Sequence, residues 1–271
     1  MTMNLGYINY LNCFPFYYHM FEKDPLPGVR VVPAIPGDLN LMMADGSLDM
    51  SPMSAGAYPD MQEKLVVLPD FCLSSIGYVR SVVLQSRVPI EELDGKRVGL
   101  TSASKTSVVL LKILLEKYYG LRPAYSTVPP RPSFENIDAA LIIGNDAMLE
   151  PDEPIEYIYD LGDLWMRKTG HPVVFAIFAV RIKALPGSSE QVRRIIRSYN
   201  HSVAYLRDYE DEVVARAAER YPEMRIDIAQ YYRLLKFHFT PQLKKALQFY
   251  YDEGAALGLF DPVKKIEFAE I

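Results

Sequence analysis

Short apolar runs alternate with amphipathic stretches along the first two thirds of the chain. The apolar runs are rich in β-branched residues, which favours strands, and the stretches between them carry apolar residues at helical spacing. This alternation is typical of an α/β architecture, in which sheets are covered by helices. Strands are predicted at residues 4–8, 29–35, 47–53, 65–73, 78–86, 97–100, 124–129, 138–144 and 173–181.

Proline and glycine mark the ends of the predicted helices. Pro15 lies where the first helix can begin, and Gly46 ends a short helix that starts at residue 36. A longer helix follows residues 101–107, and Gly120 is a suitable stop for it. From Ser188 onward the pattern is nearly continuous amphipathic helix, with breaks at proline residues 222 and 241.

The strand pattern restarts after a polar connector at residues 88–96 and returns to the first pattern near residue 177. We therefore predict two α/β lobes that are joined by two chain crossings. The first lobe comprises residues 1–86 and 178–271, and the second comprises residues 87–177. Two lobes joined in this way leave a cleft between them, and such clefts are favoured ligand sites.

The charge of the chain narrows the choice of ligand. The 271 residues carry a net charge of −5, and no run of basic residues is longer than two. Nucleic acid is therefore excluded as a partner, because phosphate backbones need a concentrated basic face. No stretch approaches the 20 or so apolar residues that cross a membrane. The start of the chain has no signal-peptide pattern, so a cytoplasmic protein is expected.

Cysteine and histidine give no indication of a metal or a disulfide. Cys13 and Cys72 lie far apart in the sequence, and buried thiols are expected at both. The four histidines show no metal-ligand spacing with one another or with the cysteines. No metal is therefore predicted.

The segment TSASKTS (101–107) is the clearest candidate for anion binding. It follows a predicted strand and begins a helix, where free N–H groups and the helix dipole attract negative charge. The alternative is that one hydroxyl caps the helix and the others are solvated. A nucleotide P-loop is excluded because its glycine spacing is absent, but phosphate and carboxylate both remain open. The candidate ligands are Ser102, Ser104, Lys105, Thr106 and Ser107.

Polar residues also follow other predicted strands. Asn12 lies between the first strand and the first helix, where its amide can donate and accept hydrogen bonds; a helix cap is the alternative. Because ligands bind at the carboxyl ends of strands in α/β sheets, several polar strand ends favour one common site over independent caps. The other candidates are Ser51, Ser54, Ser74, Ser75, Arg80, Ser81, Asn145 and Asp146.

Aromatic side chains indicate a ligand site less strongly than these polar residues do. Trp165, Phe175 and Phe178 could stack on a ring-shaped ligand, but aromatic residues at these spacings are more often core. His171 in a Gly-His-Pro turn is another candidate, although a turn histidine without a ligand role is as good an explanation.

Six segments, spread along nearly the whole chain, resemble one known family. They are INYLNCFPFYY, GSLDMSPMS, LTSASKTSVVLLKILL, ALIIGNDAML, DLGDLWMRKTGHPVVFAIFAVR and YYRLLKFHFTPQLKKAL. They are similar to menaquinone-biosynthesis proteins of the futalosine route, specifically the chorismate dehydratase branch. The Tyr-Leu-Asn element near the N-terminus separates this branch from its sibling, the 1,4-dihydroxy-6-naphthoate synthases.

The resemblance implies a bilobed periplasmic-binding-protein type II fold with two mixed sheets, used inside the cytoplasm as an enzyme. It implies dehydration of chorismate, a dicarboxylate, to 3-[(1-carboxyvinyl)oxy]benzoate without cofactor or metal. Asn12 matches the family's active-site asparagine, Ser81 lies in its binding segment, and the Ser/Thr-rich helix start is expected to bind a carboxylate. One departure is Gly77-Tyr78-Val79 in place of Gly-Pro-Val, so that Tyr78 is expected to alter the cleft wall.

Three other functions compete with this one. The fold suits a solute-binding protein for a transporter, but such proteins need an export signal. It also suits the effector domain of a transcription regulator, which would need an attached DNA-binding helix-turn-helix. The sibling synthase is disfavoured by the Tyr-Leu-Asn element and by the lack of a prominent catalytic histidine segment. The sequence gives no prediction of oligomeric state.

Overall fold

The chain forms two β-sheets in a computed structural model that describes residues 2–270. The strands of the larger sheet are β1 (Met3–Ile8), β2 (Val29–Ala34), β3 (Met50–Ser54), β4 (Leu65–Ser75), β10 (Val173–Arg181) and β11 (Leu235–His238). Their order across the sheet is β11-β4-β10-β3-β1-β2. β1 runs parallel to β2 and β3, whereas β10 is antiparallel to β3 and β4.

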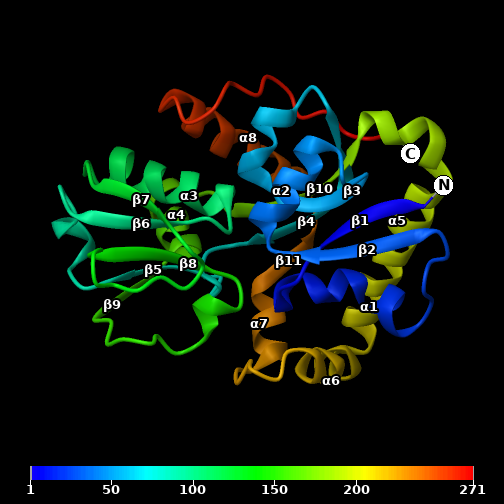
Figure 1. The fold of residues 1–271 in the computed structure, drawn as a ribbon, viewed down its shortest axis with the longest axis horizontal. Coiled ribbons are helices and arrows are strands. Elements are labelled where there is room, and N and C mark those ends of the chain that lie inside the picture. The colour runs from blue at the N-terminus through cyan, green and yellow to red at the C-terminus, as the bar shows by residue number, and fades with distance from the viewer. Residues whose placement is uncertain (1, 271) are drawn as a thin grey trace.

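The second sheet contains the strands from the middle of the chain. They are β5 (Val82–Ser86), β6 (Arg97–Thr101), β7 (Ala124–Val128), β8 (Ala139–Ile143) and β9 (Tyr157–Asp160), in the order β7-β6-β8-β5-β9. This sheet is also mixed, because β6 is parallel to β7 and β8 while β5 is antiparallel to β8 and β9. The two sheets form two lobes at opposite ends of the long axis (Figure 1).

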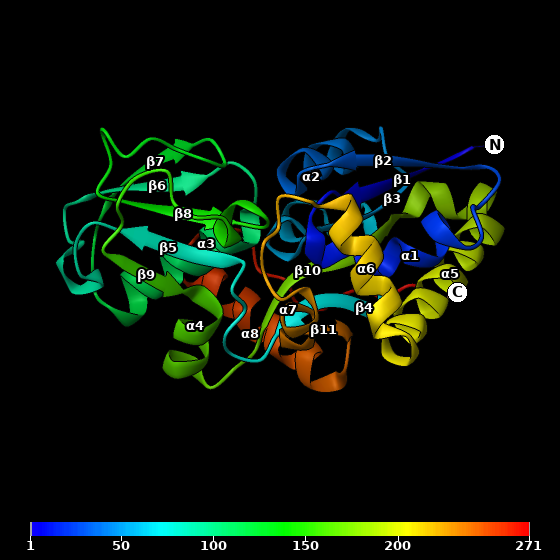
Figure 2. The ribbon, with the colours of Figure 1, turned by 90° about the horizontal axis from the view of Figure 1, so that it is seen from below.

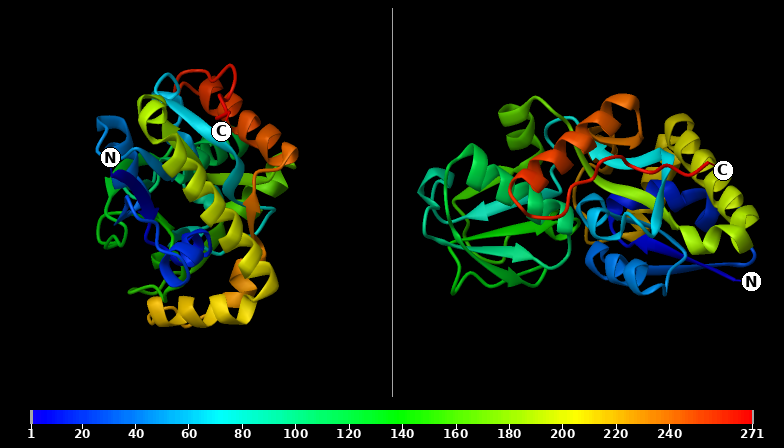
Figure 3. Two further views of the ribbon diagram at one scale, coloured as in Figure 1. Left: turned by 90° about the vertical axis from the view of Figure 1, so that its right-hand side faces the viewer. Right: turned by 90° about the horizontal axis from the view of Figure 1, so that it is seen from above.

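Helices cover both sheets and connect the lobes. They are α1 (Phe14–Glu22), α2 (Pro36–Asp45), α3 (Lys105–Lys112), α4 (Leu161–Thr169), α5 (Leu185–Asp208), α6 (Glu210–Arg220), α7 (Ile228–Leu234) and α8 (Pro241–Ala256). α3 and α4 lie on the second sheet, and α1, α2, α5 and α6 surround the first (Figure 2). α8 contacts both β10 and α3, and the segment after it runs back over the first lobe (Figure 3).

Local signals explain where these elements begin and end. Gly46 ends α2 in the left-handed conformation (φ 91°), which glycine adopts without a steric cost. The side chains of Ser104, Asp160 and Thr240 accept hydrogen bonds from the first turns of α3, α4 and α8. The predicted helix stop at Gly46 is confirmed. Two predictions are wrong: residues 78–81 of the predicted strand 78–86 lie in the turn before β5, and residues 235–238 of the predicted helical region form the strand β11.

The core of the first lobe is aromatic. The Phe16 ring packs against Phe178 with a centroid distance of 4.4 Å, and Phe71 and Tyr199 surround the pair. Cys13 and Cys72 are buried and unpaired, which confirms the prediction of two buried thiols. No helix within residues 2–270 has both the length and the hydrophobicity to cross a membrane.

The chain divides between the lobes at other positions than the expected ones. β5 pairs in the second sheet although residues 82–86 were expected in the first lobe, and all of β10 pairs in the first sheet although residues 173–177 were expected in the second. The polar connector at 88–96 is a link within the second lobe. The first crossing, residues 76–81, is a short turn directly between two strands, and residues 78–81 were expected as part of the second strand.

Candidate functional site

A cavity lined by residues of both lobes lies between them. It is the interlobe cleft that the two-lobe pattern predicted. Most of its wall is apolar, and the described residues that line it include no Asp, Glu, His, Lys or Arg. From the first lobe come Ile8, Tyr10, Asn12, Pro36, Ser54, Leu73, Phe175, Ala176 and Leu235; from the crossing and the second lobe come Val79, Ser81, Val82, Ser104, Ser107 and Ile143.

Polar atoms without a partner are concentrated at this cavity. Three residues that line it each have a buried oxygen with no hydrogen-bond partner in residues 2–270: Tyr10 (hydroxyl), Asn12 (Oδ1) and Ser54 (Oγ). Leaving a buried polar group unsatisfied costs about 1–3 kcal/mol, and such groups in native structures call for an explanation. A polar ligand in the cavity would supply hydrogen bonds that the free protein lacks.

The start of α3 brings a second set of donors to the same cavity. The Ser104 hydroxyl accepts a hydrogen bond from the Ser107 amide (3.2 Å) and lies 3.1 Å from the Ser107 hydroxyl. The amides of Lys105 and Thr106 have no acceptor among the described residues. Hydroxyls and free amides at a helix N-terminus are suited to an anion such as a carboxylate.

The crossing segment is held in a fixed conformation beside Ser81. The Asp160 carboxylate accepts hydrogen bonds from the amides of Val79 (3.1 Å) and Arg80 (2.6 Å). Burial raises the pKa of Asp160, and these amides oppose the rise because they stabilise the charged form. Arg80 adopts φ 69°, a left-handed conformation that is uncommon for a residue other than glycine. This strained turn places Ser81 and Val79 in the cavity wall.

Backbone groups of the two lobes touch directly next to the cavity. The Gly37 amide at the start of α2 donates to the Ala103 carbonyl (2.8 Å). The Thr106 hydroxyl accepts from the Gly56 amide (3.0 Å) and donates to the Phe175 carbonyl (2.8 Å), so it joins α3 to the first lobe. These contacts hold the lobes together around the cavity.

The structure brings five of the fourteen polar candidates at strand ends to the cavity. Asn12, Ser54, Ser81, Ser104 and Ser107 line it, and they come from four separate segments.

Five of the remaining candidates lie elsewhere. Ser51 is buried against β1 and donates to the Pro52 carbonyl, and Ser102 is exposed. Lys105 forms an ion pair with Asp60 outside the cavity, and Thr106 is used in the contact between lobes. The Asn145 side chain accepts from the Leu11 amide (2.9 Å), which is a bridge between the lobes.

One polar residue of the cavity, Tyr10, was not among the predicted candidates. Phe175 lines the cavity, whereas Trp165 and Phe178 are core residues. Tyr78 is 51% exposed and is not one of the residues that line the cavity, whereas its neighbour Val79 lines it. His171 stacks on Phe249 at 4.1 Å, away from the cavity.

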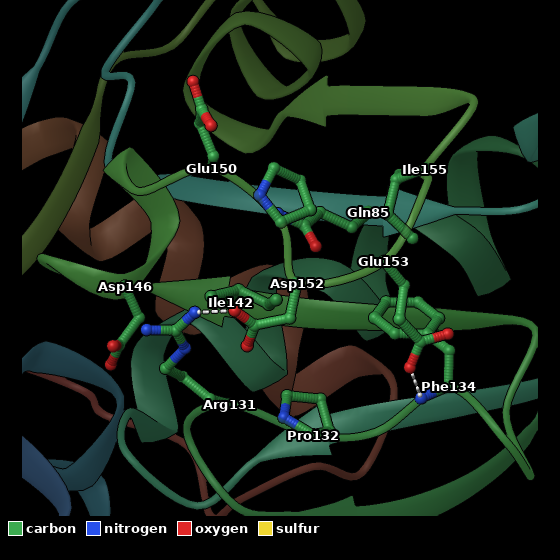
Figure 4. A pocket seen from close by; sticks show the side chains of 11 residues that line it. Gln85, Arg131, Pro132, Phe134, Ile142, Asp146, Glu150, Asp152, Glu153 and Ile155 are labelled. Carbon is green, nitrogen blue, oxygen red and sulfur yellow. Dashed lines mark hydrogen bonds and ion pairs between the residues drawn. The ribbon is translucent and has the colours of Figure 1, made fainter.

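A second hollow, of about 360 Å³, lies within the second lobe (Figure 4). Arg131 pairs with Asp152 at 2.5 Å, and Glu153 accepts from the Phe134 amide at 3.1 Å. Asp146 also faces it, with a pKa that is raised by burial. Because four carboxylates and one arginine line this hollow, it is a weaker candidate for an anion than the interlobe cavity.

Solved structures with the same fold include binding proteins. A protein of Archaeoglobus fulgidus aligns with a TM-score of 0.77 at 20% identity, covering 96% of this chain and 98% of that one. The periplasmic aliphatic sulphonate binding protein SsuA of Escherichia coli aligns with a TM-score of 0.65 at 14% identity, covering 100% and 94%. The prediction of a bilobed periplasmic-binding-protein fold with two mixed sheets is therefore confirmed.

Sequence comparison identifies the family, which the structural comparison does not. The chorismate dehydratase of Thermus thermophilus is 34% identical over 213 residues, which cover 70% of this chain and 76% of that protein. The 1,4-dihydroxy-6-naphtoate synthase of the same organism is 23% identical over 196 residues, which cover 72% and 70%. A family model described as menaquinone biosynthesis matches residues 3–256. The chain therefore belongs to the menaquinone-biosynthesis family, on its chorismate dehydratase branch.

Proposed function

We propose that this protein removes water from chorismate to give 3-[(1-carboxyvinyl)oxy]benzoate. The observation that carries the proposal is the interlobe cavity, in which neutral hydrogen-bonding groups without partners stand in an otherwise apolar wall. The similarity to a chorismate dehydratase supports the same reaction.

The cavity matches the chemistry of chorismate group by group. The substrate carries two carboxylates, one ring hydroxyl and an unsaturated ring. Ser104, Ser107 and the free amides of the α3 start can hold one carboxylate. Apolar side chains such as Phe175 and Ile143 offer a surface for the ring. We assign Asn12 and Tyr10 to the reacting side of the substrate.

The reaction needs little from the protein beyond orientation and polar contacts. The C3–H and C4–O bonds break, and the C–H electrons become the new ring double bond between C3 and C4. The hydroxyl leaves with the proton as water, and the ring becomes aromatic. The cavity wall has no carboxylate, histidine or lysine side chain. The substrate's own second carboxylate is therefore our candidate for the base, and positioning contributes the rest.

Asn12 and Tyr10 are suited to the departing hydroxyl. Burial raises the pKa of Tyr10, and the nearby carboxylates of Asp146 and Asp38 raise it further. The phenol therefore stays protonated at neutral pH and can donate a hydrogen bond to the leaving oxygen. The Asn12 amide can orient the second carboxylate or bind the same hydroxyl.

Incubation of the purified protein with chorismate in buffer containing EDTA tests the proposal. We expect a product lighter by one water, with an aromatic absorbance, detected by liquid chromatography and mass spectrometry. Boiled protein is the control. Binding of chorismate without reaction, seen as a thermal shift, would instead indicate a binding protein for small carboxylates. If chorismate neither binds nor reacts, the proposal is overturned.

The rate should depend little on pH. Substrate carboxylates are ionised above about pH 5, and no group with a pKa near neutrality lines the cavity. Because the Tyr10 pKa is raised above its ordinary value, its proton is retained through mildly alkaline conditions. We therefore expect kcat/KM for chorismate to stay within about twofold between about pH 6 and 9. A bell-shaped profile centred near neutrality would contradict this and point to a histidine or carboxyl group of the protein.

A further inference from the structure

Gly144 and Asn145, which directly follow β8, lie where three segments of the chain meet. The Gly144 amide donates to the carbonyl of Ser81 in the crossing segment at 2.8 Å. A Cβ at Gly144 would lie 2.5 Å from the ring of Tyr10, so this ring packs directly on the Gly144 backbone. Oδ1 of Asn145 accepts from the Leu11 amide at 2.9 Å. Two residues of the second lobe therefore contact both the crossing segment and the turn after β1.

The turn after β1 depends on these contacts, because it has no side-chain cap of its own. Leu11 is fully buried, and a buried backbone amide needs an acceptor, which Asn145 provides. The Leu11 carbonyl accepts from the Tyr232 hydroxyl at 3.1 Å. Tyr10 and Asn12 lie on either side of Leu11 in the sequence, and both line the cavity. The hydrogen bonds of Leu11 therefore fix the backbone that carries both polar side chains.

Glu223 fixes the orientation of the Asn145 amide. Nδ2 of Asn145 donates to Oε1 of Glu223 at 3.3 Å. Glu223 lies in the loop between α6 and α7, on the side of the first lobe that faces the second (Figure 2). The buried Tyr221 anchors this loop, since its hydroxyl donates to Oδ1 of Asn9 at 3.3 Å. A carboxylate only accepts hydrogen bonds, so it binds the nitrogen of the amide and leaves the oxygen for Leu11.

The alternative role for Asn145 is direct contact with the substrate. Asn145 does not line the cavity, although Ile143, two residues before it, does. Both ends of its amide are already bonded to protein groups. Contact with a substrate would break one of these bonds, so the geometry favours an indirect role.

We propose that Asn145 is a positioning residue that binds the Leu11 amide and so places the side chains of Tyr10 and Asn12 for the reaction. Because this bond joins the two lobes, the approach of the second lobe orders the reacting groups of the first. The inference rests on the proposed function, which assigns Tyr10 and Asn12 to the reacting side of the substrate.

Asn145→Ala tests the role, because it leaves the buried Leu11 amide without its acceptor. We expect kcat for chorismate to fall about tenfold, with a smaller change in KM, since a small displacement of reacting groups is enough for such a loss. Asn145→Asp keeps an acceptor in the same place, and the exposed Glu223 can turn to solvent. This variant should keep kcat within about threefold of the wild type. A wild-type kcat in Asn145→Ala, or an equal loss in both variants, would overturn the proposal.

Lys117→Met is the control for a contact that joins the lobes elsewhere. Nζ of Lys117 in the second lobe lies 2.7 Å from Oε1 of Glu253 on α8, and neither residue lines the cavity. We expect kcat to stay within about twofold of the wild type. A tenfold loss here as well would mean that any weaker contact between the lobes lowers the rate, and the positioning role would be overturned.

Hydrogen exchange of the Leu11 amide tests the contact without turnover. With ¹⁵N-leucine labelling, its signal is identified by its absence from the spectrum of Leu11→Met. We expect Asn145→Ala to speed its exchange about tenfold or more, and Asn145→Asp and Lys117→Met to leave it near the wild-type rate. Unchanged exchange in Asn145→Ala would overturn the inference even if chorismate is converted. Faster exchange in a protein that leaves chorismate intact would overturn only the proposed function.

Discussion

Asn12→Ala is expected to lower kcat for chorismate about 100- to 1000-fold, the range seen when one preorganised donor is removed from an active site. Asn12 lines the cavity at the turn after β1. Its amide is the strongest neutral dipole among the polar groups there. Because it interacts with charge that shifts during the reaction, its loss should affect kcat far more than KM. Steady-state kinetics with chorismate measure both.

The control lies on the same turn. Asn9 is exposed and does not line the cavity, so Asn9→Ala should keep kcat within about twofold. Asn12→Ala removes a buried amide oxygen that has no partner, so its thermal unfolding temperature should stay near that of the wild type. If Asn12→Ala raised KM strongly and left kcat unchanged, Asn12 would have a binding role only.

The sequence predicts this fold well because its signals are local. Most predicted strands are apolar runs, and stops such as Gly46 act within one helical turn. The lobe boundary is different, because β4 and β5 are similar apolar strands separated by six residues, 76–81. Which sheet β5 joins depends on pairing with β8 and β9, more than fifty residues further along the chain. Such pairing leaves no local pattern.

The difference between local and long-range signals also explains which residues of the candidate site could be predicted. Polar residues at strand ends drew attention to Asn12 and Ser81, which line the cavity. Within TSASKTS, however, successive helical residues point in directions about 100° apart. Ser104 and Ser107 are three positions apart and share a face, which is the face that meets the cavity. Lys105 and Thr106 therefore point to other neighbours, Asp60 and Phe175.

The second large effect on activity is expected from the close approach of the two lobes, and Gly37→Ala tests it. The Gly37 amide donates to the Ala103 carbonyl across the lobes. A Cβ at Gly37 would lie 2.3 Å from the carbonyl oxygen of Ser102, a backbone atom that cannot rotate away. The lobes would have to separate by roughly 1 Å to restore an ordinary contact. Since the cavity takes its donors from both lobes, we expect kcat/KM to fall about 100-fold.

The fall in kcat/KM should come from the wider spacing of the lobes and not from unfolding. Gly37 does not have a left-handed backbone, so alanine brings no backbone strain of its own. Gly187→Ala is the matched control, because nothing lies within 4 Å of the Cβ at that position, and its kcat/KM should stay within about twofold. The thermal unfolding temperature of each variant checks folding. If Gly37→Ala kept wild-type kcat/KM, the substrate would not require the backbone contact between α2 and the start of α3. The donors of Asn12 and Ser104 would then act without the close approach of the two lobes.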